Sequence, residues 1–111
     1  MALPLPKEYP CYVAYAPVDA EYPCITYSHD GSDNKFVGLA RGTQVYSFTS
    51  WAETLTECEI VSAALEKALV GYSEKDVVKT TYVENRESGF TNGLYYKRTF
   101  LRVVLVGTYG R

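Results

Sequence analysis

The stretch ETLTECEIVSAALEKALVG, residues 53–71, predicts the one long helix of this chain. Thr54, followed three residues later by Glu57, has the form of a capping box, in which side chains satisfy the backbone at a helix start. Beyond it, apolar residues recur at steps of three and four, which places them on one helical face. They are Leu55, Cys58, Val61, Leu65, Ala68 and Leu69. Gly71 is a natural stop, so we expect an amphipathic helix over residues 53–70.

The segments on both sides of this helix have the composition of β-strands, rich in β-branched and aromatic residues. We expect strands at residues 9–16, 24–28, 43–51, 77–84 and 94–106. Polar stretches with strong turn signals separate some of them, HDGSDN at 29–34 and NRESGFTNG at 85–93. The element order β-β-β-α-β-β predicts an α+β fold, in which one amphipathic helix packs on an antiparallel-leaning sheet.

The 111 residues fit a single domain spanning residues 1–111. We expect residues 1–8 to form an extended, proline-rich arm, because Pro4 and Pro6 stop any helix there. This arm lacks the basic stretch and the long apolar core of a signal peptide. No apolar run approaches the roughly 18 residues needed to span a membrane. We therefore expect no membrane association.

Charge and residue usage argue against several classes of function. The net charge is −2 and the basic residues are scattered, whereas nucleic-acid binding requires clustered cations. The single histidine, His29, is expected in a solvated loop and permits no multi-histidine metal site or His-based triad. Cys11, Cys24 and Cys58 have no C-x-x-C spacing, and we expect reduced, buried thiols. We predict no catalytic residue, metal or cofactor; an active site assembled between subunits is the alternative.

The predicted sheet is apolar on both faces, yet the sequence offers one helix to cover it. The last strand would place one set of apolar residues on one face and a second set on the other. These sets are Tyr96, Phe100, Val104 and Val106, and Leu101, Val103 and Leu105. A helix of about 18 residues is roughly 27 Å long and covers one face. Either the sheet folds over itself or another subunit covers the second face. The 11 tyrosines suit strands and interfaces alike.

The order of these segments resembles the tail completion, or tail terminator, proteins of long-tailed bacteriophages. Four stretches carry the resemblance: PVDAEYPCITYS at 17–28, VYSFTSWAETLTECEIVSAALEKAL at 45–69, TTYVENRES at 80–88 and LYYKRTFLRVVLVG at 94–107. The match covers residues 9–107. Many members of that family begin with a helix, where this chain has only its proline-rich start.

The resemblance implies a non-enzymatic structural protein of the virion, made in the host cytoplasm and located in the tail or neck. Its copies would form a ring, usually a hexamer, that caps the tail tube and joins it to the head-side connector or stopper. By this analogy, the loops 30–42 and 86–93 would reach toward the tube, the connector or the lumen. The candidate assembly residues are Asp30, Asp33, Lys35, Arg41, Arg86, Glu87, Phe90 and Asn92. The alternatives are another neck protein, such as a connector or stopper, and a small cytosolic module that binds a peptide or protein through its sheet.

Overall fold

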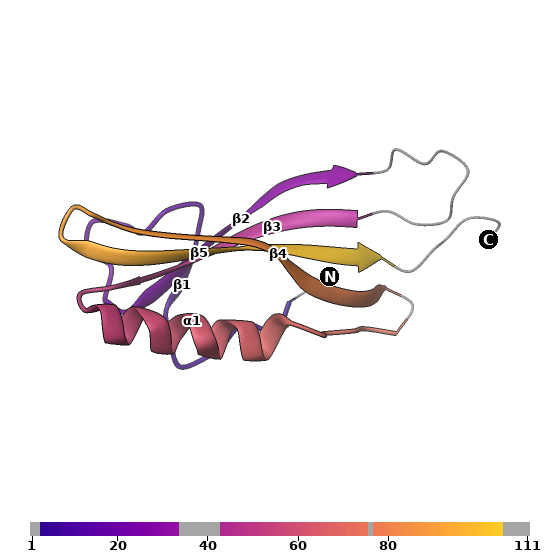
Figure 1. Ribbon diagram of the computed structural model, residues 1–111, viewed down its shortest axis with the longest axis horizontal. Helices are drawn as coiled ribbons and strands as arrows, with labels where there is room; N and C mark the ends of the chain where they lie inside the picture. Colours follow the sequence, from indigo (N-terminus) through magenta and orange to yellow (C-terminus); the bar gives the residue numbers. More distant parts are fainter. Residues whose placement is uncertain (1–2, 34–42, 76, 106–111) are drawn as a thin grey trace.

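The computed structural model describes residues 3–33, 43–75 and 77–105, and of residues 30–33 only the backbone. Its elements in chain order are β1 (Cys11–Val13), β2 (Cys24–Asp33), β3 (Thr43–Ala52), α1 (Leu55–Leu69), β4 (Val78–Thr91) and β5 (Leu94–Leu105). Figure 1 shows one layer of long strands with the single helix packed along one side. The predicted α+β class and the predicted chain order are confirmed.

The five strands form one sheet with the spatial order β1-β2-β3-β5-β4. β5 therefore lies inside the sheet, and β4 lies at an edge. β1 runs parallel to β2, while every other neighbouring pair is antiparallel. The sheet is thus mixed but mostly antiparallel.

Helix α1 begins where the sequence pattern predicted. The hydroxyl of Thr54 accepts a hydrogen bond from the backbone N–H of Glu57 at 3.2 Å, which satisfies one donor of the first turn. Five of its residues are buried: Cys58, Val61, Ser62, Leu65 and Leu69. Leu55, the first residue of the helix, was expected on this buried face but is 56% exposed.

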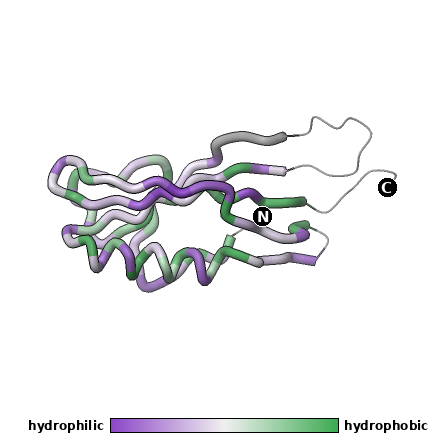
Figure 2. The backbone as a smooth tube through the Cα atoms, viewed as in Figure 1, coloured by the Kyte–Doolittle hydropathy of each residue, from purple (hydrophilic) through white to green (hydrophobic). Residues whose placement is uncertain are grey.

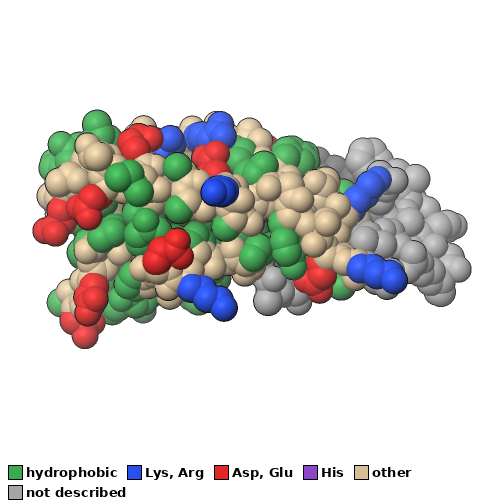
Figure 3. All heavy atoms as spheres, turned by 90° about the horizontal axis from the view of Figure 1, so that it is seen from below, with side chains coloured by type: hydrophobic (Ala, Val, Ile, Leu, Met, Phe, Trp, Pro, Cys, Tyr) green, Lys and Arg blue, Asp and Glu red, His purple; other side chains and the backbone are tan. Residues whose placement is uncertain are grey.

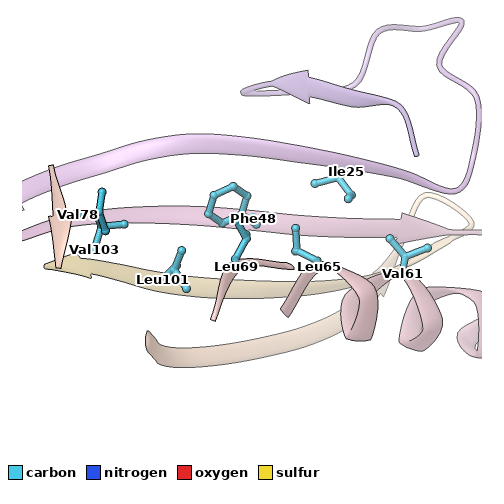
Figure 4. Packing of buried hydrophobic residues seen from close by; sticks show 8 residues of the cluster. All are labelled: Ile25, Phe48, Val61, Leu65, Leu69, Val78, Leu101 and Val103. Carbon is cyan, nitrogen blue, oxygen red and sulfur yellow. The ribbon is translucent and has the colours of Figure 1, made fainter. Parts of the chain in front are cut away.

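The core lies between α1 and the sheet. Figure 4 shows Val61, Leu65 and Leu69 of α1 facing side chains of the strands. The strand residues of this cluster are Ile25, Phe48, Val78, Leu101 and Val103. Leu3 and Leu5 of the proline-rich N-terminal segment pack against the same cluster.

The two polar stretches that predicted turns are largely strand. β2 continues through His29 to Asp33, paired with β3, and β4 continues to Thr91, paired with β5. Only Asn92 and Gly93 remain as the β4–β5 turn, with positive φ angles of 52° and 79°. Pairing with a neighbouring strand satisfies the backbone of both stretches, which outweighs the weak strand preference of their polar residues. Figure 2 shows the resulting hydrophilic stretch along β4.

The first strand is shorter than predicted. Of residues 9–16, only Cys11–Val13 form β1, because Ala14 has a φ of 70° and turns the chain away from the sheet. The residues that follow become part of the site described next.

The molecule is elongated, with extents of 50 × 23 × 22 Å. α1 has 15 residues, which gives a length of about 22 Å. The sheet therefore extends well beyond the end of the helix (Figure 1).

Candidate functional site

The face of the sheet away from α1, called here the helix-free face, is built by alternate strand residues. Phe48 and Leu101 pack toward α1, so their neighbours along each strand point the other way. The strand register aligns these neighbours in rows. Thr26 lies opposite Thr49, which lies opposite Arg98. The helix-free face is therefore a defined surface that crosses β2, β3 and β5.

One end of this face is hollowed into a pocket of about 620 Å³. The segment that leads from β1 to β2 borders it on one side, and the β4–β5 turn borders it on another. Aromatic residues line it, among them Tyr15, Tyr22, Trp51 and Phe100. Hydroxyl groups line it as well, from Thr26, Ser28, Ser47 and Thr49 among others. Its size and mixed lining fit the usual range of small-ligand sites.

Hydrogen bonds fix the side chains around this pocket. The indole Nε1 of Trp51 donates to Oγ1 of Thr26 at 2.9 Å. The Nε of Arg98 donates to Oγ1 of Thr49 at 3.1 Å. Both threonines are buried, at 6% and 4% exposure. The pocket is therefore bounded by side chains that already hold their positions, which lowers the cost of ordering them around a ligand.

Arg98 joins the pocket to the edge of the sheet. Its Nη1 lies 2.9 Å from Oε1 of Glu87 on β4, and its guanidinium carbon lies 5.9 Å from the ring centre of Tyr96. Among the described residues around the pocket, Arg98 is the one that carries a charge. The electrostatic character of the pocket therefore depends on how firmly Glu87 holds this guanidinium.

A second ion pair lies further along the helix-free face. Arg102 donates through Nε to a carboxylate oxygen of Glu84, and through Nη1 to Oγ1 of Thr43 at 2.7 Å. The hydrogen bond from Arg102 lowers the pKa of Glu84 below its ordinary value. This pair lies outside the pocket lining.

The two arginines correct the expected polarity of this face. The register places Tyr96, Phe100 and Val104 on the helix-free face, as the alternating pattern predicted. Arg98 and Arg102 alternate with them, however, so the face is amphipathic and not uniformly apolar. Val106 lies outside the described residues.

The predicted assembly residues of β4 divide between two faces instead of forming one loop. Arg86 points to the helix side, where it binds Glu66 of α1. Phe90, on the same side, packs against Tyr95 with ring centres 4.7 Å apart. Glu87 lies on the helix-free face and contacts Arg98, and Asn92 in the turn lines the pocket.

Two further predicted assembly residues, Asp30 and Asp33, lie in the half of the sheet away from the pocket. Asp30 and Asp33 belong to β2 and not to a loop, because β2 pairs with β3 as far as Asp33. Lys35 and Arg41 lie outside the described residues. Of the predicted residues that the structure describes, it places Glu87 and Asn92 near the pocket, Glu87 through its contact with Arg98 and Asn92 in the lining.

The residues that define the pocket were not predicted from the sequence. Tyr22, Thr49, Trp51 and Arg98 come from three separate segments, which meet only after β2, β3 and β5 pair. One signal was available, because two arginines at a four-residue spacing alternate with aromatic and aliphatic residues in the strand LYYKRTFLRVVL. That spacing places both on one face of a strand.

The three thiols and the histidine lie in positions that do not activate them as nucleophiles or bases. Cys24 and Cys58 are buried and Cys11 is half-buried, and all three are free thiols. Burial raises the pKa of Cys24 to about 11, which keeps the thiol protonated and weakly nucleophilic at neutral pH. His29 is exposed as expected but lies in β2, stacked on Tyr46 with ring centres 4.7 Å apart.

Within residues 3–33, 43–75 and 77–105, no three side chains of the metal-binding types gather as a metal site would require. None of the helices in the same ranges is both long and apolar enough to cross a membrane.

Comparison with known proteins adds no family to these observations. No protein-family model and no curated protein sequence matches this chain.

Proposed function

We propose that this chain is a non-enzymatic structural protein of a phage virion, similar to tail terminators, whose copies form a ring. The ring caps the tail tube and presents a surface to the head-side connector or stopper. A connector or stopper of the neck is a close variant of the same proposal. The observation that supports it most is that the sheet is about twice as long as the one helix that covers it.

The sheet is longer than α1, so part of its helix side extends past the helix, and within the described residues the helix-free face beyond the pocket is also available to a neighbour. β4, with 14 residues, is about 46 Å long, against about 22 Å for α1. Beyond the pocket, this face presents Tyr82, which is 46% exposed, beside the Arg102–Glu84 ion pair. An aromatic residue next to an arginine is typical of protein interfaces, where Tyr and Arg are enriched. A second copy that packs here would bury the tyrosine.

The edge strand β4 has features that discourage a strand of another copy from pairing with it. β4 carries charged residues along its length, and its pairing shifts register between Val78 and Thr80 and between Val83 and Asn85. Charges and bulges on an edge strand discourage further strands from adding to it. A closed ring that uses the face of the sheet fits this edge better than a fibre that extends the sheet.

The outer surface of α1 supplies a second surface for such a ring. Neighbours in a ring meet through two different surfaces of the same subunit. Leu55 and Ile60 on α1 are each 56% exposed. Figure 3, which views the molecule from the helix side, shows hydrophobic side chains interspersed with acidic and basic ones. We propose that the helix surface of one copy meets the helix-free face of the next, beyond the pocket.

Negative-stain electron microscopy of the purified protein, alone and mixed with phage tail tubes, tests this proposal. We expect closed rings, either free or at tube ends. Tyr82→Asp should abolish the rings, because it places a charge in the contact, whereas Val18→Asp, at an exposed loop position, should preserve them. Single subunits in both samples, with bare tube ends, would contradict the proposal.

The pocket favours one alternative of a different class, a small module that binds a peptide or protein through its sheet. Such a module would remain a stable monomer and would bind its partner at the aromatic lining of the pocket. The same micrographs separate the two functions, because a binding module forms no ring under either condition.

A further inference from the structure

The pocket on the helix-free face has an apolar wall that is fixed in place. The Trp51 ring is held by the hydrogen bond from its Nε1 to Thr26 and by contact with Tyr96, at 5.3 Å between ring centres. Tyr22 and Phe100 also line the cavity. Aromatic rings held in this way provide a surface on which a flat apolar group can stack without a large entropic cost.

Several polar groups around the pocket can donate hydrogen bonds. Thr26 and Thr49 each accept a hydrogen bond, from Trp51 and Arg98 respectively, so each hydroxyl retains its own proton for donation. Arg98 uses Nε and Nη1 in its contacts with Thr49 and Glu87, and a guanidinium has five N–H donors in all. No acidic residue is among the described residues that line the cavity. The donors and the single positive charge are complementary to an anionic acceptor.

We infer that this pocket binds a ligand in which a carboxylate is joined to a flat aromatic group, with the carboxylate at Arg98 and the ring against Trp51. The cavity of about 620 Å³ accommodates a group of this size. The ligand is either a free small molecule or the C-terminal aromatic residue of a partner chain, since both present the same chemistry. This inference stands on the pocket alone and does not depend on ring formation.

Glu87 is expected to compete with the ligand for Arg98. Its carboxylate already lies 2.9 Å from Nη1 of the guanidinium, and both side chains are partly exposed. Removing that charge should free the guanidinium and strengthen binding, whereas removing Arg98 should weaken it. The Arg102–Glu84 pair is a matched control, because it lies on the same face and the same two strands but outside the pocket lining.

The intrinsic fluorescence of Trp51, the single tryptophan of the chain, reports directly on the pocket. N-acetylphenylalanine is the probe, and N-acetylphenylalaninamide is the neutral control of nearly the same shape. We expect a saturable fluorescence change with the acid and at least about tenfold weaker binding of the amide, because a charge-assisted hydrogen bond is lost. A peptide that ends in phenylalanine with a free carboxylate, compared with its amidated form, distinguishes a partner's C-terminus from a small molecule.

Substitutions test whether Arg98 binds the carboxylate of the ligand. Arg98→Gln should weaken binding of the acid by about tenfold, Glu87→Gln should strengthen it, and Arg102→Gln should leave it unchanged. Amide NMR spectra show whether Arg98→Gln folds. If it does not, Thr49→Val removes a different hydrogen-bond donor of the pocket and should also weaken binding of the acid. Three results would overturn the inference. The first is equal affinity for the acid and the amide, and the second is an equal effect of Arg98→Gln and Arg102→Gln on the affinity for the acid. The third is the absence of a saturable fluorescence change with any probe.

Discussion

The guanidinium of Arg86 on β4 binds both carboxylate oxygens of Glu66 on α1, with Nε 2.8 Å from Oε2 and Nη2 2.7 Å from Oε1. This two-point contact ties the single helix to the edge strand of the sheet. Arg86 was predicted to take part in assembly, and in the structure its half-exposed guanidinium forms this ion pair within the chain. Its hydrogen bond lowers the pKa of Glu66 below the ordinary value.

We expect Arg86→Gln to change how stability depends on pH. A carboxylate with a lowered pKa contributes stability above its unfolded pKa, about 4.3 for glutamate, and loses it as the pH falls through the folded value. The substitution should therefore lower the free energy of unfolding at neutral pH and leave it nearly unchanged in strong acid. Urea titrations at several pH values measure this, with Glu66→Gln as the matched variant. A loss of equal size at every pH would contradict the role of this pair.

Ser62→Ala should stabilise the protein. Ser62 is buried between α1 and the sheet, and among the described residues its hydroxyl has no hydrogen-bond partner. Removing an unsatisfied buried hydroxyl and gaining the helix preference of alanine should add about 1 kcal/mol to the free energy of unfolding. Ser88→Ala, at an exposed strand position, should change it by less than about 0.5 kcal/mol. Urea unfolding measures both, and a destabilised Ser62→Ala variant would show that the hydroxyl is satisfied.

Two leucines of the same helix should respond differently to truncation. Leu65 is fully buried, so Leu65→Ala should cost about 2–5 kcal/mol of unfolding free energy. Leu55→Ala should cost less than about 0.5 kcal/mol, because that side chain is more than half exposed. Similar losses at both positions would mean that Leu55 is also buried, for example by another subunit.

Gly89→Ala should disturb the aromatic side chains of the helix-free face. A Cβ atom at Gly89 would lie 2.7 Å from the hydroxyl of Tyr96 and 2.8 Å from its ring, so the ring must move. Because Tyr96 packs on Trp51, the fluorescence spectrum of Trp51 should shift. We expect a loss of about 1 kcal/mol in unfolding free energy, as for mild overpacking. An unchanged spectrum would show that Tyr96 does not rest over Gly89 in solution.

The sequence predicted the helix and the order of the elements because those features depend on local chemistry. Thr54 and the apolar repeat after it lie within one segment, and α1 starts and ends within two residues of the predicted bounds. The errors arose where distant partners decide the structure. The stretches around Asp33 and Glu87 have turn-like composition, yet pairing with β3 and β5 makes them strand.

The pocket could not be predicted for the same reason. Thr26, Trp51 and Arg98 are far apart in the chain, and only the sheet order places them on one surface. The apolar alternation in β5 was recognised, but the arginines within it were not assigned to the helix-free face. Arg98 and Arg102 form ion pairs with the edge strand β4. These charges make the face suitable for specific polar contacts with a partner, and not only for burial of apolar surface.

Sedimentation velocity over a wide range of protein concentration, without and with phage tail tubes, tests most directly whether a second copy covers the helix-free face. We expect one discrete assembly of fixed size, formed either by the protein alone or on the tubes, and we expect Tyr82→Asp to abolish it. A single species with the mass of one subunit at every concentration, which does not co-sediment with tubes, would contradict it.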